Sequence, residues 1–316
     1  MTPLPKDLQV LHGFFMIMSF VLGTTLGSFA NVCICRWPAG LSIVKPRSRC
    51  PKCMNEIQWF DNIPLVSWVL LRAKCRNCDQ PISVIYPTVE LITGLLFLAA
   101  YWRFGYSPAT LVYMALCAAM VIITFQDLAD WTIPDQITLP GIPLGLVLSL
   151  AGMYWGQASG LRVLDVFDSM GGIALGAGIL FALDRITVLL LKKPGMGMGD
   201  MKLLAMIGAF LGWKGALGAL MLGSVIGSFI GVSVLLYYRK RDEATVTASG
   251  EPETDDTKKK EDDKKDSDDN ITLEGHYLPF GPYLAVGGLL YLFFGPELIN
   301  WYIASLSPSA PALVIQ

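Results

Sequence analysis

Apolar residues of this chain gather in long blocks that are separated by short polar stretches. Most blocks run for roughly 18 to 24 residues, which is long enough to cross a bilayer as a helix. In lipid, a helix also satisfies its own backbone hydrogen bonds. The stretches expected to span a membrane are 12–34, 87–104, 108–126, 136–155, 168–191, 200–212, 215–238 and 278–302. The pattern therefore predicts an all-α polytopic membrane protein with about eight transmembrane helices.

The distribution of Lys and Arg predicts the orientation of these spans, because cytoplasmic loops carry an excess of basic residues. The loop after the first stretch holds Arg36, Lys45, Arg47, Arg49, Lys52, Arg72, Lys74 and Arg76. Further basic clusters follow the fifth and seventh stretches. Eight alternating spans place all three groups in the cytoplasm and both termini outside it. The alternative is a cleaved signal peptide ending near Ala30, but the basic residues beyond it resist export.

Composition and charge exclude several classes of protein. Hydrophobic residues make up 53% of the 316 and charged residues only 16%, which argues against a soluble enzyme, a disordered chain, a collagen-like chain and a nucleic-acid binder. The net charge of −2 is uneven, because residues 239–275 hold 8 of the 24 basic and 13 of the 26 acidic residues. The remainder has 16 basic and 13 acidic residues, a net of +3. We expect 239–275 to be a disordered cytoplasmic linker, with partner docking as the alternative.

These patterns divide the chain into five parts. The expected divisions are the first span (1–35), a cytoplasmic four-cysteine loop (36–86), a transmembrane core (87–238), the charged loop (239–275), and the last span with its tail (276–316).

Four of the seven cysteines have the spacing of a metal site. Cys50 and Cys53 form one C-x2-C pair, and Cys75 and Cys78 form another after 21 intervening residues. Two such knuckles complete a tetrahedral site of four thiolates, which suits zinc. Disulfides are the alternative in an oxidising compartment, and a redox pair is the alternative on a βαβ unit. The expected cytoplasmic side and the absence of that unit favour a closed, structural zinc site.

The other three cysteines, Cys33, Cys35 and Cys117, lie in or beside apolar spans and are expected to be small buried side chains.

Acidic residues at the ends of spans are candidates for chemistry, because carboxylates are costly in a membrane. Asp127 ends the third stretch, and Asp200 opens the sixth after a glycine-rich segment. Two carboxylates facing one water can act as general base and general acid. The structural alternatives are a solvated turn for Asp127, Asp130 and Asp135 and a helix cap for Asp200.

Other charged and titratable residues of the spans compete poorly for a catalytic role. Asp184 and Arg185, inside the fifth stretch, are expected either to form an intramembrane ion pair or to extend their charged ends to the membrane surface. The two histidines, His12 and His276, fall on opposite sides of the expected topology, so a serine-type triad has no support.

Five separated segments resemble the prepilin peptidases, also called type IV leader peptidases, which are membrane aspartic proteases. These segments are Gly27–Arg36 (G-S-F-x-N-V), the four-cysteine loop running into Tyr86–Glu90, Asp127 with Pro134 and Asp135 (D-x6-P-D), Gly197–Leu204 (G-x-G-D-x-K-L-L), and Leu278–Pro282 (P-F-G-P). They occur in the family's order over about residues 22 to 290.

The resemblance implies that Asp127 and Asp200 are the catalytic pair and that Cys50, Cys53, Cys75 and Cys78 hold zinc. It implies cleavage of the leader peptide of type IV prepilins or type II secretion pseudopilins at the cytoplasmic face of the bacterial inner membrane. Members with the four-cysteine loop also methylate the new N-terminal residue with S-adenosylmethionine. The sequence does not place that cofactor's site, for which Glu90 is a guess.

The chain departs from the family pattern in two places. Ala129 stands where a second aspartate is common, and the charged stretch 242–270 resembles an insertion. The alternative function is a non-enzymatic membrane transporter or assembly scaffold with a structural zinc loop. Carboxylates at span ends suit a transport path less well than carboxylates at the middle of the membrane.

Overall fold

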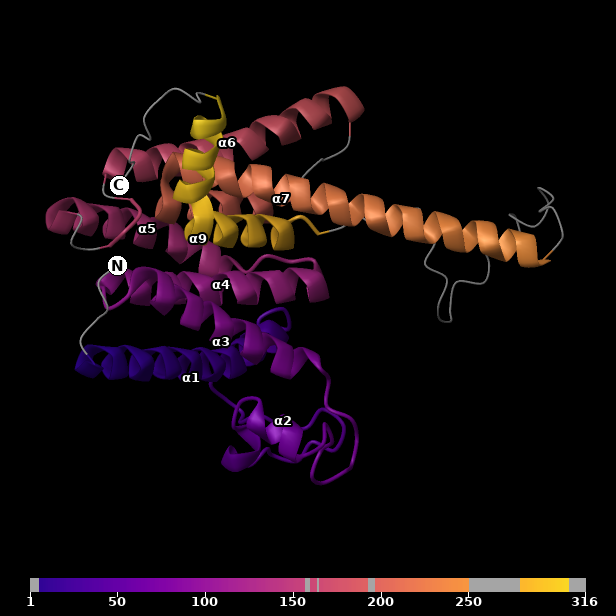
Figure 1. Cartoon of the computed structure of the whole chain (residues 1–316). Coiled ribbons are helices and arrows are strands. Elements are labelled where there is room, and N and C mark those ends of the chain that lie inside the picture. The colour runs from indigo at the N-terminus through magenta and orange to yellow at the C-terminus, as the bar shows by residue number, and fades with distance from the viewer. Residues whose placement is uncertain (1–5, 157–159, 164, 193–196, 250–278, 307–316) are drawn as a thin grey trace.

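The computed structural model describes residues 6–156, 160–163, 165–192, 197–249 and 279–306. Within these residues the fold is all-helical, and pairing of β type is limited to two isolated bridges. The long helices are α1 (Lys6–Arg36), α3 (Ile85–Phe104), α4 (Pro108–Asp130), α5 (Asp135–Trp155), α6 (Val166–Leu191), α7 (Met198–Ser249) and α9 (Gly281–Leu306). All seven contain a stretch long and apolar enough to cross a membrane. The chain is a multi-pass membrane protein, as the hydrophobic pattern predicts (Figure 1).

The sixth and seventh apolar stretches belong to a single helix, α7, which is interrupted at Gly212. This residue has φ 73° and ψ −176°, a conformation that glycine adopts readily and that breaks the helical hydrogen-bond ladder. Before the break, Gly208 lies against Gly172 and Leu204 against Gly176, so this segment runs antiparallel to α6.

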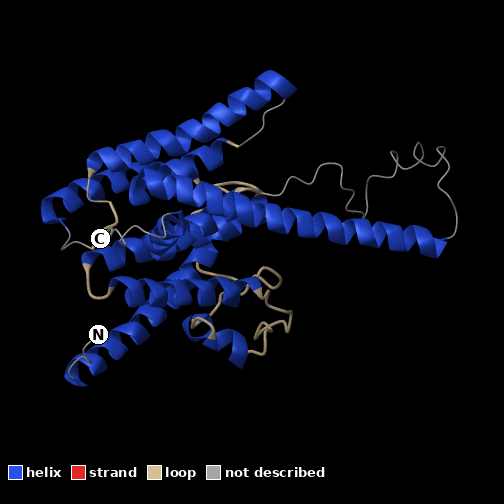
Figure 2. Cartoon of the chain, turned by 45° about the horizontal axis from the view of Figure 1, so that its top comes forward, coloured by secondary structure: helices blue, strands red, loops and turns tan. Residues whose placement is uncertain are grey.

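After the break, α7 packs along α9. Ala219 lies against Gly287 and Gly223 against Tyr283, so the second segment of α7 runs antiparallel to α9 and heads back toward the start of that helix. The first segment leaves this same end of the bundle. Among the described residues, the eight expected spans therefore correspond to eight segments of the long helices, and α7 supplies two of them (Figures 1 and 2).

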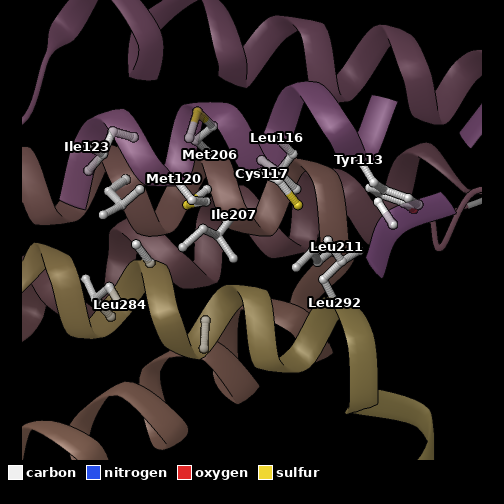
Figure 3. Close-up of a cluster of buried hydrophobic side chains, with 14 of the residues drawn as sticks. Tyr113, Leu116, Cys117, Met120, Ile123, Met206, Ile207, Leu211, Leu284 and Leu292 are labelled. Carbon is white, nitrogen blue, oxygen red and sulfur yellow. The ribbon is translucent and has the colours of Figure 1, made fainter. Parts of the chain in front are cut away.

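The main core lies where α4, the first segment of α7 and α9 meet. Figure 3 shows Cys117 and Met120 of α4 facing Ile207 of α7, with Leu284 and Leu292 of α9 on the other side. All five side chains are at most 1% exposed. The same three elements carry Asp127, Asp200 and Gly281, so this packing sets the positions of these residues.

Helices α1 and α3 form a second tight pair. A Cβ atom on Gly23 would lie 2.8 Å from the Cα of Gly94, and one on Gly27 would lie 2.7 Å from the Cα of Glu90. Such small residues let membrane helices approach closely. The first stretch is thus an integral helix of the bundle, which disfavours its removal as a signal peptide.

Between α1 and α3 the chain forms a small lobe outside the bundle. It contains a short 3-10 helix, η1 (Trp59–Asn62), and one turn and a half of helix, α2 (Val66–Leu70). Figure 1 shows this lobe at the end of the bundle where α1 finishes and α3 begins.

Helix α7 continues to Ser249, so residues 239–249 of the expected charged loop are helical and the expectation of disorder is wrong for them. The reason is local: the apolar span has already started the helix, and few residues of 239–249 disfavour its continuation. The rest of the expected charged loop, 250–275, and His276 lie outside the described residues.

Candidate active site and metal site

Asp127 lies in the last turn of α4 and is only 5% exposed. The helix ends at Asp130 because Trp131 adopts a left-handed conformation, with φ 56°, and its N–H donates to the carbonyl of Asp127. Pro134 then precedes the first residue of α5. The chain therefore turns sharply and leaves the Asp127 side chain facing inward, so the alternative of a solvated turn does not hold for Asp127.

The first residue of α9 lies directly over this carboxylate. The backbone N–H of Gly281 donates a hydrogen bond to Asp127. A Cβ atom on Gly281 would lie 2.5 Å from Asp127 Oδ2 and 3.0 Å from Ile133 Cδ1. Only glycine fits here without movement of a neighbour, which gives the glycine of the P-F-G-P segment a structural role.

Asp200 occupies the first turn of α7 and is half-buried. Its carboxylate is close enough to that of Asp127 for Coulombic repulsion between them. Ile133, between α4 and α5, lies against both Gly199 of α7 and Gly281 of α9, so its side chain connects these three segments around the two carboxylates. Asp200 is inside the helix and is not its N-cap, contrary to the structural alternative.

Two neighbouring carboxylates in a poorly hydrated site can share one proton. Mutual repulsion disfavours the doubly ionised state, so one member stays protonated while the other is ionised. Such a pair can accept a proton from water and donate one to a substrate oxygen or nitrogen. The site thus has the groups needed for hydrolysis of a peptide bond.

An ion pair joins the two motifs that carry these aspartates. Lys202 Nζ lies 2.7 Å from Asp135 Oδ1 and 2.9 Å from Asp135 Oδ2. The contact connects the start of α5 with the first turns of α7. Asp130 is exposed at the end of α4, as expected for a solvated residue. The two sequence motifs D-x6-P-D and G-x-G-D-x-K are therefore connected through Asp135 and Lys202 as well as through the carboxylate pair.

Gln126 is a residue of this region that sequence reasoning missed. It is 3% exposed, and its side-chain amide nitrogen approaches Thr132 Oγ1 at 3.4 Å. Its carbonyl oxygen is buried and has no hydrogen-bond partner among the described residues. A polar residue directly before Asp127 in an apolar helix was the available signal.

The expected intramembrane pair is present in α6. Asp184 Oδ2 lies 3.7 Å from an Arg185 guanidinium nitrogen, and the guanidinium also stacks over the ring of Phe181. His12 lies in α1, where its ring nitrogen contacts the hydroxyl of Tyr101.

The lobe brings the four cysteines of the two C-x2-C pairs together. The sulfur atoms of Cys50, Cys53, Cys75 and Cys78 all lie within 4.8 Å of one another, and Cys50 and Cys78 are 3.8 Å apart. Tetrahedral coordination with Zn–S bonds of about 2.3 Å places thiolates roughly 3.8 Å apart. All four thiols are free, since a disulfide needs sulfur atoms about 2 Å apart.

The two knuckles have the same local structure. In the first, Met54 has φ 60° and its N–H donates to the carbonyl of Cys50. In the second, Asp79 has φ 53° and its N–H donates to the carbonyl of Cys75. Each knuckle is closed by one isolated bridge, Arg49 with Glu56 and Lys74 with Pro81.

The thiols have unequal proton affinities. Backbone N–H groups of Cys53 and Lys52 lower the pKa of Cys50 to about 6. At Cys78 the Gln80 N–H acts in the lowering direction, but burial and hydrogen bonds to the other three thiols together raise the pKa to about 12. Four negatively charged thiolates at this spacing repel one another unless a cation lies between them. The four-cysteine cluster can therefore hold a metal ion, as the spacing predicts.

Of the remaining cysteines, Cys33 and Cys117 are buried as expected. The expectation for Cys35 is wrong, because this thiol is exposed at the end of α1, where the helix leaves the bundle, and lies 4.0 Å from the hydroxyl of Tyr86.

A cavity of about 470 Å³ lies between the lobe and the adjoining ends of α1 and α3. Glu90, the residue guessed as a cofactor contact, lines this cavity and is 8% exposed. Its carboxylate accepts hydrogen bonds from the Leu65 N–H, at 2.8 Å, and from Ser28. Cys35 and Tyr86 also lie on the cavity wall.

The fold and these sites define a multi-pass membrane protein with a paired carboxylate site at one end of its bundle and a four-cysteine lobe. Residues 21–104 match the Bacterial Peptidase A24 N-terminal domain, and residues 114–232 match the Type IV leader peptidase family. No solved structure matches the chain.

Similar proteins extend over nearly the whole chain. A "Prepilin leader peptidase/N-methyltransferase" of Myxococcus xanthus (strain DK1622) is 35% identical, over 90% of this chain and 91% of the relative. A protein of the same name from Aeromonas hydrophila is 31% identical over 94% and 98%, and one from Neisseria gonorrhoeae is 37% identical over 70% and 83%. The chain belongs to the type IV leader peptidase family, and the resemblance carried by the five sequence segments is confirmed.

Proposed function

We propose that this protein cleaves the leader peptide of type IV prepilins or type II secretion pseudopilins, with Asp127 and Asp200 as the catalytic pair. The observation that carries the proposal is that α4, α7 and α9 bring these two carboxylates together at one end of the bundle, under Gly281. The family and the names of the relatives support the reaction class.

In the proposed mechanism the ionised carboxylate takes a proton from a water molecule, which attacks the scissile carbonyl carbon. The protonated carboxyl donates to the carbonyl oxygen as it becomes negative, and a proton then passes to the departing amine. Gly281 N–H orients the Asp127 carboxylate. The buried position of Asp127 strengthens these interactions, because water competes less for its oxygens.

The expected substrate has a short basic leader followed by an apolar helix. The apolar helix of the substrate lies among the spans of the enzyme. The scissile bond at the start of that helix is then at the depth of the span ends, where Asp127 and Asp200 lie. The positive-inside pattern supports placing this end of the bundle at the cytoplasmic face of the inner membrane, with both termini on the other side. The basic lobe, 36–86, is on the same face.

For the lobe we propose a structural zinc ion bound by Cys50, Cys53, Cys75 and Cys78. Four protein ligands leave no open coordination position, so the ion stabilises the fold and takes no part in hydrolysis. Two short helices and two isolated bridges give the lobe little regular structure of its own. Metal binding is then a large part of its folding free energy.

We further propose that the enzyme N-methylates the new N-terminal residue of the cleaved pilin, as the names of the relatives indicate. S-adenosylmethionine supplies the activated methyl group when it is bound. The division of labour proposed is that the core, 87–238, carries out proteolysis and that the lobe, with the adjoining helix ends, serves methylation.

The experiment is co-expression with a prepilin, followed by mass spectrometry of the pilin N-terminus. The expected product lacks the leader and carries one additional methyl group. The purified protein in detergent is tested on a prepilin in the same way. If the prepilin stays intact with both the unaltered protein and Asp127→Asn, the protein is a transporter or an assembly scaffold instead.

A further inference from the structure

The cavity between the lobe and the bundle contains a buried carboxylate, that of Glu90, which belongs to none of the ion pairs among the described residues. Glu90 is 8% exposed, and its carboxylate accepts hydrogen bonds from the backbone N–H of Leu65 and the hydroxyl of Ser28. Two basic residues of the wall pair elsewhere, Arg49 with Glu56 and Arg76 with Asp61. A buried carboxylate without an ion-pair partner is costly, so a cationic ligand gains affinity at this position.

The backbone opposite Glu90 is strained. Leu65 has φ 62° and ψ −47°, and the Val66 N–H donates to the carbonyl of Pro64 at 2.6 Å, which is a tight γ-turn. This turn is rare because a side chain crowds the backbone at positive φ. The Leu65 N–H is the group that donates to Glu90. The strained turn thus aims a backbone donor into the cavity wall and holds the lobe against α3.

Other groups on the wall suit a ligand with an aromatic ring and several polar atoms. Trp68 of the lobe and Tyr86 of α3 supply aromatic faces. Asn31 lies on the α1 side, where its amide nitrogen donates to the carbonyl of Tyr86 at 3.1 Å. A volume of about 470 Å³ is within the usual range for small-molecule sites.

We propose that this cavity binds S-adenosylmethionine, with Glu90 next to the positive charge of the cofactor and Trp68 or Tyr86 against its adenine ring. The proposal rests on the methyltransferase activity proposed above. In the reaction, the neutral amine of the cleaved pilin bonds to the methyl carbon as the sulfur–carbon bond breaks. The bonding electron pair returns to sulfur, and the amine then loses a proton to water.

A basic leader peptide is the competing occupant, since it also carries positive charge. Four basic residues, Arg36, Arg49, Lys52 and Arg76, also line the cavity. They disfavour a peptide with several positive charges, whereas the carboxylate of S-adenosylmethionine can pair with one of them. The cavity also lies beside the ends of α1 and α3, whereas the aspartates lie at the ends of α4, α7 and α9. A cavity apart from the hydrolytic pair agrees with a second reaction on the same substrate.

The first test uses the unaltered protein in detergent, photo-crosslinked to methyl-labelled S-adenosylmethionine and mapped by peptide mass spectrometry. Label is expected within residues 28–36, 61–71 or 82–90. Label found only in peptides of other helices overturns the proposal. This measurement requires no mutation, so it does not depend on whether a variant folds.

The second test compares the dissociation constant for S-adenosylmethionine in Glu90→Gln and in Glu297→Gln, a matched change in an exposed residue of α9 that pairs with Arg103. The Glu90 variant should bind at least tenfold more weakly, and the Glu297 variant within twofold of the original protein. Zinc content and thermal unfolding report whether the lobe is intact. Unchanged affinity for the cofactor, with weaker binding of a basic leader peptide, assigns the cavity to the leader.

Pilin methylation by the unaltered enzyme separates this proposal from the function on which it rests. Methylated pilin with label mapping elsewhere means that the enzyme is a methyltransferase and that the cavity is the wrong place. If the pilin is cleaved but never methylated, and the enzyme binds no S-adenosylmethionine, the enzyme is not a methyltransferase.

Discussion

The amide of Gly281 lies against the carboxylate of Asp127, so that the first residue of α9 covers the last turn of α4. The contact joins two segments that are more than 150 residues apart in the sequence. It explains why a glycine is needed at this point, since a Cβ atom would lie 2.5 Å from Asp127 Oδ2.

Gly281→Ala should therefore reduce leader cleavage by tenfold or more while the protein remains folded. The added methyl group has to displace the carboxylate or Ile133, and small misplacement of a catalytic group has large effects on rate. Gly178→Ala is the control, because a Cβ atom there meets nothing within 4 Å. Cleavage rates of the two variants in the same detergent decide the matter, and equal rates would contradict this role for Gly281.

Asp127→Asn and Asp200→Asn should each abolish cleavage and leave the protein in the membrane. The amide keeps the shape of the carboxyl group but cannot exchange its proton, and each tenfold loss of rate corresponds to about 1.4 kcal/mol of barrier. Asp130→Asn is the control and should have a mild effect, since this residue is exposed. If Asp127→Asn or Asp200→Asn cleaves at more than about a tenth of the normal rate, the activation barrier has risen by less than roughly 1.4 kcal/mol. The assignment of the catalytic pair is then wrong.

The ion pair between Lys202 and Asp135 should couple the two aspartate motifs. Lys202→Met and Asp135→Asn are each expected to slow cleavage by up to about fivefold, because an exposed pair contributes roughly 1 kcal/mol at most. The double variant should be no slower than the slower single variant, as expected for residues that act through one contact. Losses that simply add in a double-mutant cycle mean that the two residues act independently.

Replacing Cys50 and Cys53 together with serine should release zinc and reduce methylation more than proteolysis. The two knuckles bind one metal ion, so loss of one pair removes the whole site, while the proposed protease carboxylates lie outside the lobe. Cys35→Ser is the control for zinc content, since this thiol is outside the cluster. Elemental analysis and the methylation state of the same pilin are measured together.

The metal assignment fails if the unaltered protein contains no zinc, or if it is isolated under reducing conditions with a Cys53–Cys75 disulfide. A Cys50/Cys53 variant with full methylation and no proteolysis would reverse the proposed division of labour between the lobe and the core.

The contact between α6 and the first segment of α7 should be sensitive to a single methyl group. A Cβ atom on Gly172 would lie 2.7 Å from the carbonyl carbons of Gly208 and Gly212. Gly172→Ala is therefore expected to destabilise the fold by about 1–3 kcal/mol. Gly178→Ala, on the same helix, should be neutral or stabilising by up to about 1 kcal/mol, because alanine favours a helix. Thermal unfolding of the two variants in detergent is the measurement. Equal stabilities would contradict a tight contact between α6 and the first segment of α7.

The sequence by itself determined the all-helical membrane fold, because the length of the apolar stretches and the need to satisfy backbone groups in lipid leave few alternatives. It also determined the four-cysteine cluster, since C-x2-C spacing constrains each pair locally.

The tertiary structure decided what depends on contacts between distant segments. Asp127 and Asp200 come together only because α4 and α7 pack against each other, and Gly281 covers Asp127 only because α9 lies beside both. The reversal of α7 at Gly212 and the exposure of Cys35 likewise follow from packing. The cavity around Glu90 has the same origin: its wall combines two helix ends with a lobe folded by its own knuckles, and no local pattern of residues specifies that meeting.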